Sequence, residues 1–371
     1  MVPDQPDVVS KDRGGLTGPD TAGPQRRSCR IPSAAGKALD GVPDNPILGG
    51  QDQRIAELFV PGPASQPRDG SMTEKAAFDI VMMGHFAKDQ IVVDGRRTEA
   101  CGGGVYYGSM ALRRLGKRVA VVTRLHPDDF HLLDELKQAG IPVHAQQAPE
   151  TSGIENTYDA SDMERRICRP LGFAGPLQRE EVPDWTARIF IAAPIIAGEF
   201  DLPFVEWLAR RGPVGLDVQG FVRVREGDRL VFRDWSDMAR GLAHVTYLKV
   251  DLAEAELLTG QSDAVVAARR LAEYGPREIV LTQSAGMTVL ADGQVAQAPF
   301  RPRSQAGRTG RGDTCFATYL GMRLTEPPDR AAQIAAAITT LKQEQPGPWR
   351  GSLADVDALI ASEPSGNSDN P

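Results

Sequence analysis

The sequence predicts an α/β fold built on a mostly parallel sheet that helices cover on both faces. Beyond about residue 72, short and continuously apolar runs alternate with longer amphipathic stretches. Residues 80–83 and 279–282 are runs of the first kind, which is typical of strands buried on both faces. Residues 106–115 belong to the second kind, with apolar positions along one helical stripe. This alternation is the pattern of parallel βα units.

Each element of this pattern has its own signal. The apolar runs predict strands at residues 80–83, 119–122, 189–192, 214–218, 245–250 and 279–282, and the amphipathic stretches predict helices at 106–115, 130–139, 202–211 and 264–274. Residues 91–100 and 153–171 mix polar and apolar side chains, as strands exposed on one face do, and we expect them to form a small β lid. Residues 288–298 predict a hairpin, because Ala291-Asp292-Gly293 supplies a turn.

The composition limits the classes of function. The 371 residues carry 49 acidic and 42 basic side chains, and the net charge of -7 argues against general nucleic-acid binding, which needs basic residues to neutralise phosphates. The 4 cysteines are scattered, as expected of a protein in the reducing cytoplasm, and the 5 histidines include no pair at metal-ligand spacing. No apolar run of about 18 residues is present, so we expect no membrane span.

The two ends of the chain differ in composition from the middle. Residues 1–71 are rich in Pro, Gly, Asp, Ser and Arg and lack apolar periodicity, which predicts a disordered extension. Met72 comes shortly before the first convincing strand and is a candidate start codon, whereas a regulatory tail is the alternative interpretation. We therefore expect one folded domain at residues 72–363 and a flexible tail at residues 364–371.

A glycine-rich segment at residues 307–313 carries the strongest functional signal. It leads into an amphipathic helix, whose first amide groups lack partners and carry the positive end of the helix dipole. Gly310, Arg311 and Gly312, called the anion-hole loop below, therefore predict a site for a phosphoryl group, with Asp313 at its edge. Asp313 is alternatively a simple N-cap, but an ordinary cap does not require two nearby glycines.

A second glycine cluster, Gly102 to Gly104, precedes the helix expected at residues 106–115. Glycines at this point let the backbone approach a ligand closely, and the alternative interpretation is a tight strand-to-helix turn. The dinucleotide-binding fingerprint GxGxxG fails here because Tyr107 stands at the third glycine, and no Walker A sequence is present. Dehydrogenase function therefore ranks last.

Together, these motifs resemble those of the PfkB or ribokinase-like family of carbohydrate and nucleoside kinases, over roughly residues 78–361. Residues 102–116 are similar to the family's early pattern of two glycines, a helix and a closing Leu-Gly. Residues 307–313 are similar to its late signature Asp-Thr-x-Gly-Ala-Gly-Asp, and residues 249–260 are similar to its Asn-x-x-Glu region and the helix that follows. The resemblance implies a ribokinase-like three-layer sandwich with a small β lid.

The resemblance also implies a mechanism. Asp313 matches the catalytic base, which takes the proton from the acceptor hydroxyl as that hydroxyl attacks the γ-phosphate of ATP. The anion-hole loop matches the amides that bind the transferring phosphoryl group. Asp251 and Glu254 match the residues that organise water around Mg²⁺. Their alternative interpretation is a helix N-cap with a solvated acid.

The remaining positions concern the substrate and the nucleotide. Asp89 falls where the family places an acid that grips substrate hydroxyls, with a surface turn as the alternative, and Gly102, Gly103 and Tyr107 fall in the substrate-binding region. The nucleotide-binding region matches Thr282, Ser284 and Thr309. The implied partners are a small sugar or polyol and, through the lid, a second copy of the chain.

The chain departs from the family pattern at several positions. Gly307 and Arg308 replace the signature's Asp and Thr, which bear on the family's monovalent-cation site. Arg311 replaces a small residue and adds a permanent cation to the anion hole. Tyr107 stands where sugar kinases often carry an Asn. Residues 215–223 and 345–348 are more similar to the inositol-kinase-like branch than to ribokinase itself.

The leading interpretation is an ATP- and Mg²⁺-dependent kinase that phosphorylates a hydroxyl of a sugar or polyol. A nucleoside kinase is the nearest alternative, and a degenerate sensor that binds a nucleotide or sugar without catalysis is another. Arg311, Gly312 and Asp313 also spell an adhesion motif, but a folded glycine loop would not display it.

Overall fold

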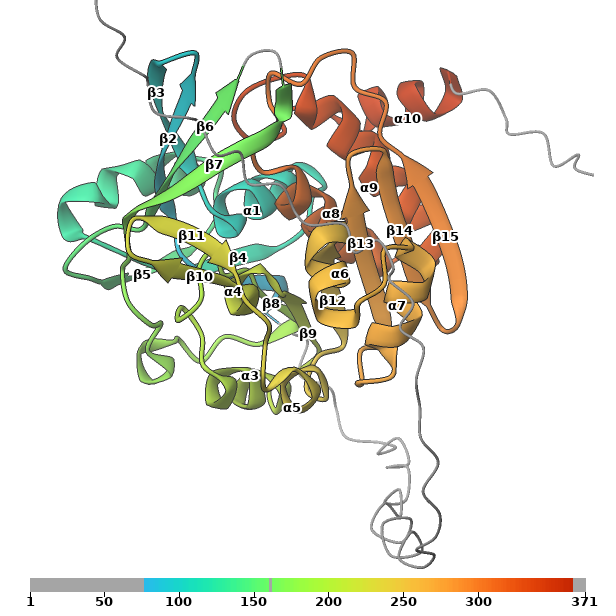
Figure 1. The fold of residues 1–371 in the computed structure, drawn as a ribbon, viewed down its shortest axis with the longest axis horizontal. Helices are drawn as coiled ribbons and strands as arrows, with labels where there is room; N and C mark the ends of the chain where they lie inside the picture. Colours follow the sequence, from blue (N-terminus) through green and yellow to red (C-terminus); the bar gives the residue numbers. More distant parts are fainter. Residues whose placement is uncertain (1–76, 160–161, 363–371) are drawn as a thin grey trace, which may run out of the picture. The chain divides into compact units, whose positions relative to one another are not determined.

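The computed structural model describes residues 77–159 and 162–362, which are drawn in colour in Figure 1. The expectations for residues 1–71 and 364–371 lie outside these described residues. Within them, the predicted fold class is confirmed by a large, mostly parallel sheet between two layers of helices, with a smaller sheet beside it.

The large sheet has nine strands, in the order β15-β14-β13-β12-β9-β8-β1-β4-β5. Their bounds are β1 (Phe78–Met83), β4 (Val119–Leu125), β5 (Val143–Gln147), β8 (Ala187–Ala192), β9 (Val214–Asp217), β12 (Tyr247–Asp251), β13 (Glu278–Gln283), β14 (Gly286–Ala291) and β15 (Gln294–Pro299). Pairing is parallel from β5 to β13, and only β14 and β15 at one edge are antiparallel. The predicted strands are thus confirmed, and the last two form the predicted hairpin.

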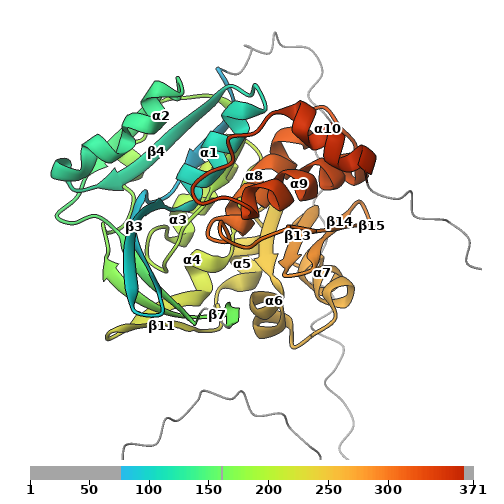
Figure 2. The same cartoon turned by 90° about the horizontal axis from the view of Figure 1, so that it is seen from above.

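Helices cover both faces of this sheet, as the continuously apolar strands predict. One layer holds α1 (Gly104–Arg114), α2 (Asp134–Gln138), α8 (Arg311–Arg323), α9 (Pro328–Gln343) and α10 (Leu353–Ser362), and the other holds α3 (Leu202–Ala209), α5 (Met238–Leu242), α6 (Leu252–Thr259) and α7 (Ala264–Ala272), as Figure 2 shows. In β1, Ile80 and Met82 pack into the core under the first layer, whereas Val81 and Met83 pack into the core under the second. A strand with two apolar faces therefore needs both layers.

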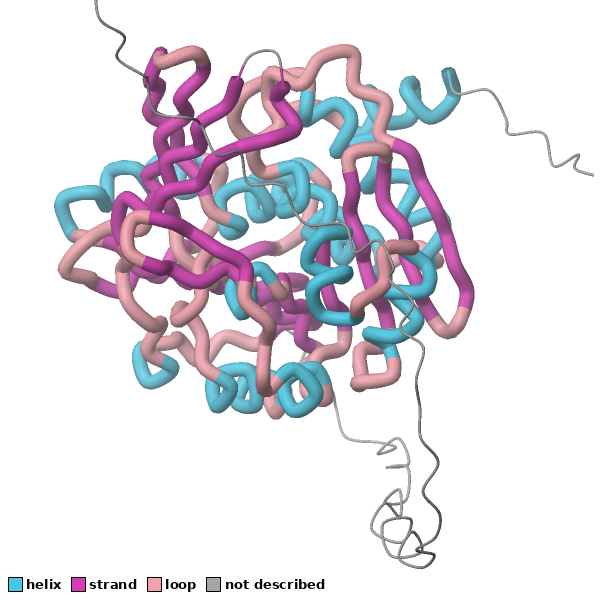
Figure 3. The backbone as a smooth tube through the Cα atoms, in the orientation of Figure 1, coloured by secondary structure: helices cyan, strands magenta, loops and turns pink. Residues whose placement is uncertain are grey.

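The smaller sheet, called the lid below, has the strand order β3-β2-β6-β7. Its strands are β2 (Ala87–Val93), β3 (Arg96–Gly102), β6 (Gly153–Asp159) and β7 (Asp162–Gly172), and Figure 3 shows them gathered apart from the large sheet. The predicted lid segments are confirmed. A short hairpin of β10 (Arg223–Glu226) and β11 (Arg229–Phe232), next to α4 (Gln219–Val222), was not predicted.

Two Asp-Gly pairs close the hairpins by the same chemistry. Asp94 and Gly95 join β2 to β3 with φ values of 47° and 79°, and Asp292 and Gly293 join β14 to β15 with the same two values. Two consecutive residues with positive φ are the mark of a type I′ turn, whose twist suits a two-residue hairpin.

Candidate active site

The site lies at the edge where the parallel strands of the large sheet end. Asp217 is the last residue of β9, Asp251 is the last residue of β12, and Lys249 lies two residues before it. Because the carboxyl ends of parallel strands meet at one edge, the topology brings these charges together beside the start of α8. Thr282 is paired in register with Asp251 on the neighbouring strand β13.

The anion-hole loop forms the start of α8. Gly310 is the N-cap residue in a left-handed conformation with φ of 81°, which favours glycine. A Cβ atom at Gly310 would lie only 2.3 Å from the ring of Tyr107, so the loop rests directly on that ring. The amides of Gly312 and Asp313, in the first turn, have no acceptor within the helix. The geometry therefore suits the anion hole that the sequence predicts.

Asp313 is the third residue of α8. The residue keeps part of its surface accessible, while its carboxyl group lies in the protein interior. Burial raises the pKa of Asp313, and the charge of Asp217 acts in the same direction, whereas Lys249 and other nearby cations oppose the rise. The carboxylate is thus a stronger base than an exposed aspartate, as a group that accepts a proton from a hydroxyl needs to be.

The glycine cluster at the start of α1 lies between two carboxylates. A Cβ at Gly102 would lie 2.0 Å from Oδ2 of Asp89, and a Cβ at Gly104 would lie 3.0 Å from Oδ1 of Asp313. Asp89 is buried, and its Oδ1 accepts a hydrogen bond of 2.8 Å from the amide of Ile154. The backbone turn therefore lies next to both Asp89 and Asp313. This is a suitable place for an acceptor hydroxyl.

Lys249 links the strand ends to the anion-hole loop. Its Nζ donates to Oδ1 of Asp217 at 3.1 Å and lies 3.7 Å from Oε2 of Glu254. A Cβ at Gly312 would lie 3.5 Å from the same nitrogen, so the ammonium group lies against the loop. Burial alone lowers the pKa of Lys249, but Asp217 and Glu254 outweigh this and raise it above its usual value. A fixed positive charge therefore lies beside the predicted anion-hole loop.

Asp251 and Glu254 form a reciprocal capping box at the start of α6. Asp251 Oδ1 accepts from the amide of Glu254, and Glu254 Oε2 accepts from the amide of Asp251, both at 2.8 Å. The capping interpretation of these residues is thus realised. Glu254 is fully buried rather than solvated, and its Oε1 has no hydrogen-bond partner among the described residues. That orphaned oxygen has the chemistry to hold a Mg²⁺ ion through water.

A direct protein cage for a metal ion is not formed by the described part of the chain. It holds no group of three or more His, Cys, Asp or Glu side chains that could bind one. The residues present therefore fit Mg²⁺ bound mainly by water and substrate oxygens, with one buried carboxylate behind the water.

Lys342, in the last turn of α9, contacts the segment that leads into the anion-hole loop and was not predicted from the sequence. Its Nζ donates to the carbonyl oxygens of Gly307 and Thr309, just before the anion hole. Burial lowers the pKa of Lys342 to about 7, and the charge of Asp313 acts in the opposite direction. A lysine in an otherwise ordinary amphipathic helix offers no sequence signal for such a role.

The predicted nucleotide-binding residues are less closely grouped. Thr282 is buried at the end of β13, and Ser284 is exposed in the turn that follows. Thr309 belongs to the loop before α8, where its carbonyl contacts Lys342. The hydroxyl of Tyr107 donates to the carbonyl of Cys101 at 3.2 Å. The ring of the same tyrosine lies against Gly310 of the anion-hole loop.

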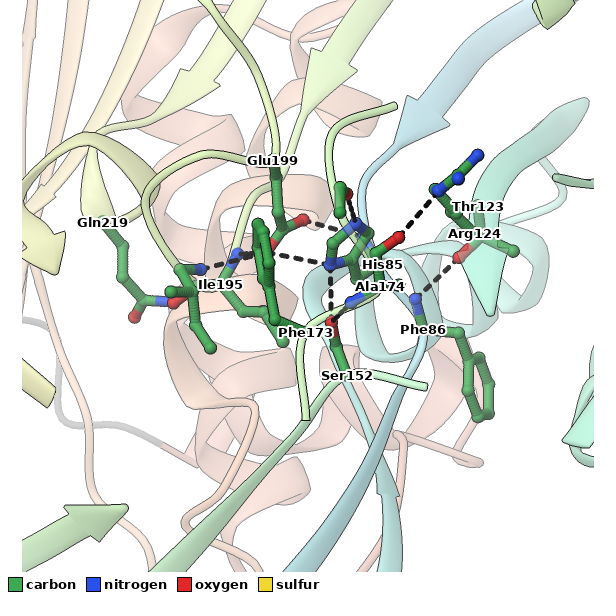
Figure 4. A network of polar contacts seen from close by, with 12 residues as sticks. His85, Phe86, Thr123, Arg124, Ser152, Phe173, Ala174, Ile195, Glu199 and Gln219 are labelled. Atoms are coloured by element: carbon green, nitrogen blue, oxygen red, sulfur yellow. Dashed lines mark hydrogen bonds and ion pairs between the residues drawn. The ribbon is translucent and has the colours of Figure 1, made fainter. Parts of the chain in front are cut away.

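A buried polar network connects the lid to the large sheet (Figure 4). His85, between β1 and β2, places Nε2 2.8 Å from the carbonyl of Gly175, and its Nδ1 is 2.7 Å from the hydroxyl of Ser152. Because a carbonyl only accepts, Nε2 carries the proton and Nδ1 accepts from Ser152. The Ser152 oxygen accepts in turn from the amide of Ala174 at 2.9 Å.

The segment that leaves the lid after β3, at Gly103, also contacts this histidine. A Cβ at Gly103 would lie 2.3 Å from the carbonyl oxygen of His85, and Gly103 has a φ of 90°. Burial lowers the pKa of His85 to about 3, so the ring is neutral. His85 thus lies in the segment that enters β2 and contacts the other three segments that enter or leave the lid.

Comparison with solved structures establishes the family. A pyrophosphate-dependent kinase of the ribokinase family, solved with sulfate, is 35% identical with a TM-score of 0.71, and the match covers 75% of this chain and 99% of that one. The chain belongs to the ribokinase family. A pyrophosphate-dependent myo-inositol-1 kinase, converted into a myo-inositol-3 kinase by two substitutions, is another relative in the family, 33% identical with a TM-score of 0.69 over 76% of this chain and 99% of that one.

More distant structures share the fold with this ribokinase-family chain. The ribokinase of Arabidopsis thaliana, solved with ribose and ATP, is 17% identical with a TM-score of 0.62, and covers 77% of this chain and 100% of its own. Neither a family model nor a curated protein matched the chain. Among the described residues, no helix is long and apolar enough to cross a bilayer.

Proposed function

We propose that this ribokinase-family protein transfers a phosphoryl group from inorganic pyrophosphate to a hydroxyl group of a cyclic polyol such as myo-inositol. Two relatives that are 35% and 33% identical are described as pyrophosphate-dependent kinases, and the second acts on myo-inositol. The observation within this chain that carries the choice of donor is the concentration of basic residues in the segment that leads into the anion-hole loop.

The segment from Phe300 to Arg311 is strongly basic in a chain whose net charge is -7. It holds the four arginines Arg301, Arg303, Arg308 and Arg311 and no acidic residue. Lys249 and Lys342 add two ammonium groups at the start of α8. Pyrophosphate has no nucleoside to bind, so nearly all of its binding energy has to come from such charges. A dense cationic loop is what this donor requires.

Asp313 would act as the general base. Its carboxylate accepts the proton of the acceptor hydroxyl while the hydroxyl oxygen forms a bond to the nearer phosphorus of the donor. The bond from that phosphorus to the bridging oxygen breaks, and orthophosphate leaves. The amides of the anion-hole loop and Arg311 stabilise the charge on the transferring group. Glu254 would hold Mg²⁺ through water, and the ion neutralises donor phosphates when bound.

The acceptor would lie near Asp89 and Asp313, beside the glycine cluster that lies next to both carboxylates. Asp89 also lines a cavity of about 350 Å³ at the base of the lid, together with Glu99, Asp129, Glu150 and Lys88. Carboxylates outnumber the single lysine among these charged groups. Such a lining favours an uncharged acceptor with several hydroxyl groups over one that already carries a phosphate.

ATP is the second candidate donor. The observation that favours it is the position of Thr282 and Ser284 at the sheet edge, next to the strand that carries Lys249 and Asp251. A donor with a nucleoside would extend along that edge, where these hydroxyl groups could contact it. Thr282 and Ser284 remain proposed contacts for this case.

Replacing Arg311 tests the donor assignment. Arg311→Ala removes one cation from the anion hole, and we expect kcat/KM for pyrophosphate to fall by about a hundredfold. The loss with ATP should be smaller, because a nucleoside supplies binding energy elsewhere. Steady-state kinetics with both donors and myo-inositol measure the difference, and Arg269→Ala, an exposed position on α7, is the matched control. Equal losses with both donors would refute the assignment.

A further inference from the structure

We propose that the side-chain ammonium of Lys342 is a built-in cation that orients the anion-hole loop, so that phosphoryl transfer does not need a free monovalent cation at this loop. The inference rests on the proposed function in one respect, namely that the donor phosphate binds at the start of α8. It adds a positioning residue that acts through the backbone and does not itself touch the reacting atoms.

The contacts of Lys342 define a small cation site. The residue is only 2% exposed, and its Nζ donates to the carbonyl oxygens of Gly307 and Thr309. The same nitrogen lies 4.8 Å from the ring centre of Tyr107, which places the charge over an aromatic face. Two carbonyl oxygens and a ring are acceptors for positive charge. All three stabilise the ammonium form and oppose the effect of burial, which lowers the pKa of Lys342.

The peptide plane transmits the position of the ammonium to the phosphate site. In a trans peptide the C=O and the following N–H point in opposite directions. When the carbonyl of Thr309 points to Lys342, the N–H of Gly310 therefore points away from it. Gly310 is the N-cap of α8, and its Cα lies over the ring of Tyr107. The ammonium thus fixes the direction of one amide of the anion hole.

The start of the loop is fastened to the same end of α9. The amide of Gly307 donates to the carbonyl of Gln343 at 2.7 Å, and a Cβ at Gly307 would lie 1.8 Å from the carbonyl oxygen of Gln345. Glycine is therefore required at 307 for this close approach. Lys342 lies at the centre of the contact, in the last turn of α9, where the helix dipole also favours a cation.

The chemistry of this site predicts which ions can take the place of the Lys342 ammonium group in a variant that lacks it. Backbone carbonyl groups are the ligands that bind K⁺ and ammonium in proteins. Removal of the side chain would leave two carbonyls facing a space of about the size of an ammonium ion. A small monovalent cation that enters this space should restore the loop, whereas a tetramethylammonium ion is too large.

The test compares wild-type protein with Lys342→Met in buffers whose only monovalent cation is tetramethylammonium. We expect wild-type kcat with pyrophosphate and myo-inositol to be unchanged by added KCl or ammonium chloride. Lys342→Met should lose about a hundredfold in kcat, the cost of losing one anion-hole donor, and recover about tenfold with ammonium or potassium. Lys137→Met, at an exposed lysine that pairs with Asp134, is the matched control.

Several outcomes would overturn the inference. Strong activation of the wild type by potassium would show that the ammonium does not replace a free cation. A Lys342→Met protein that keeps its activity, or that is inactive at every cation concentration while its thermal unfolding and gel-filtration profile match the wild type, would contradict the orienting role. If the variant does not fold, Lys342→Gln keeps a polar side chain of similar length without the charge, and activation by ammonium or potassium should appear in it.

Calorimetric binding of methylenediphosphonate separates this inference from the proposed function. We expect the affinity of Lys342→Met, but not that of the wild type, to rise when ammonium is added. If the wild type binds this analogue yet shows no turnover with any acceptor, the proposed function fails while the binding comparison still decides the role of Lys342. Binding that is insensitive to cations in both proteins would refute the inference.

Discussion

Asp313 derives its proposed reactivity from its surroundings more than from its identity. It lies in the first turn of α8, beside free helix amides and within reach of the fixed charge of Lys249. Burial raises the pKa of its carboxyl, and the cations limit the rise. The result is a carboxylate that is a stronger base than an exposed aspartate.

The pH profile tests this description of Asp313. Because its pKa lies above the usual 3.8, kcat/KM should fall as the pH is lowered through a value higher than that of an exposed aspartate. Asp313→Asn should reduce kcat by at least about a thousandfold, because general-base catalysis is lost. Asp292→Asn, in an exposed turn that accepts asparagine, serves as the control. A wild-type profile with no acidic limb above that of free aspartate would contradict the description.

The sequence predicts the residues that lie in motifs but not those that reach the site from elsewhere. Asp313, the anion-hole loop and Asp89 follow from local patterns, and the structure brings them together around the glycine cluster. Lys342 and Asp217 come from a helix end and a strand end that are distant in sequence. Their roles depend on packing between layers, which a single sequence without an alignment does not reveal.

At the scale of elements, the lid is joined to the large sheet through His85. The ring bonds to Ser152 and Gly175, the backbone carbonyl touches the Gly103 turn, and Glu199 accepts from the His85 amide at 2.9 Å. Buried networks of this kind stabilise one arrangement because each member is satisfied. The segments that connect the lid to the large sheet and the glycine turn at Gly103 are therefore held in place by the same residue, His85.

A lower pH should destabilise this buried network around His85. The pKa of His85 is lowered by burial from 6.5 to about 3 in the folded protein, so the stability it contributes is present above pH 6.5 and lost as the pH falls toward 3. The loss should approach about 1.4 kcal/mol per pH unit in that window. Thermal unfolding of the wild type and His85→Gln between these pH values measures it, with exposed His131→Gln as control. At pH 6.5 the His85→Gln variant should be less stable than the wild type, and its stability should fall less steeply as the pH is lowered. Parallel curves of stability against pH for the two proteins would refute this.

Two hairpins, β2–β3 and β10–β11, were not predicted from the sequence. The β2–β3 hairpin carries the same Asp-Gly turn signal as β14–β15, yet only the latter was assigned as a hairpin. In the lid the flanking strands mix polar and apolar residues, which obscures their alternation. The β10–β11 hairpin has strands of four residues each, too short for a clear period.

At the scale of the whole molecule, the parallel strand order brings the proposed catalytic groups together at the carboxyl ends of the strands, with the lid beside them. The fold was predictable because the central strands of the large sheet contain continuously apolar runs. The proposed donor was not predicted, because the feature that favours it is a set of arginines in the segment before one loop rather than a motif. The expected homodimer through the lid stays a prediction, and the exposed Ile167 on β7, 62% accessible, is consistent with it.

The most direct test of the central claim is phosphorus NMR of the protein with Mg²⁺, pyrophosphate and myo-inositol. We predict that an inositol phosphomonoester and orthophosphate appear in equal amounts, and that neither appears with Asp313→Asn. Formation of the phosphomonoester from ATP alone would contradict the donor assignment. Release of orthophosphate without any phosphomonoester, in a mixture that contains a panel of polyols and sugars, would contradict the proposed kinase activity itself.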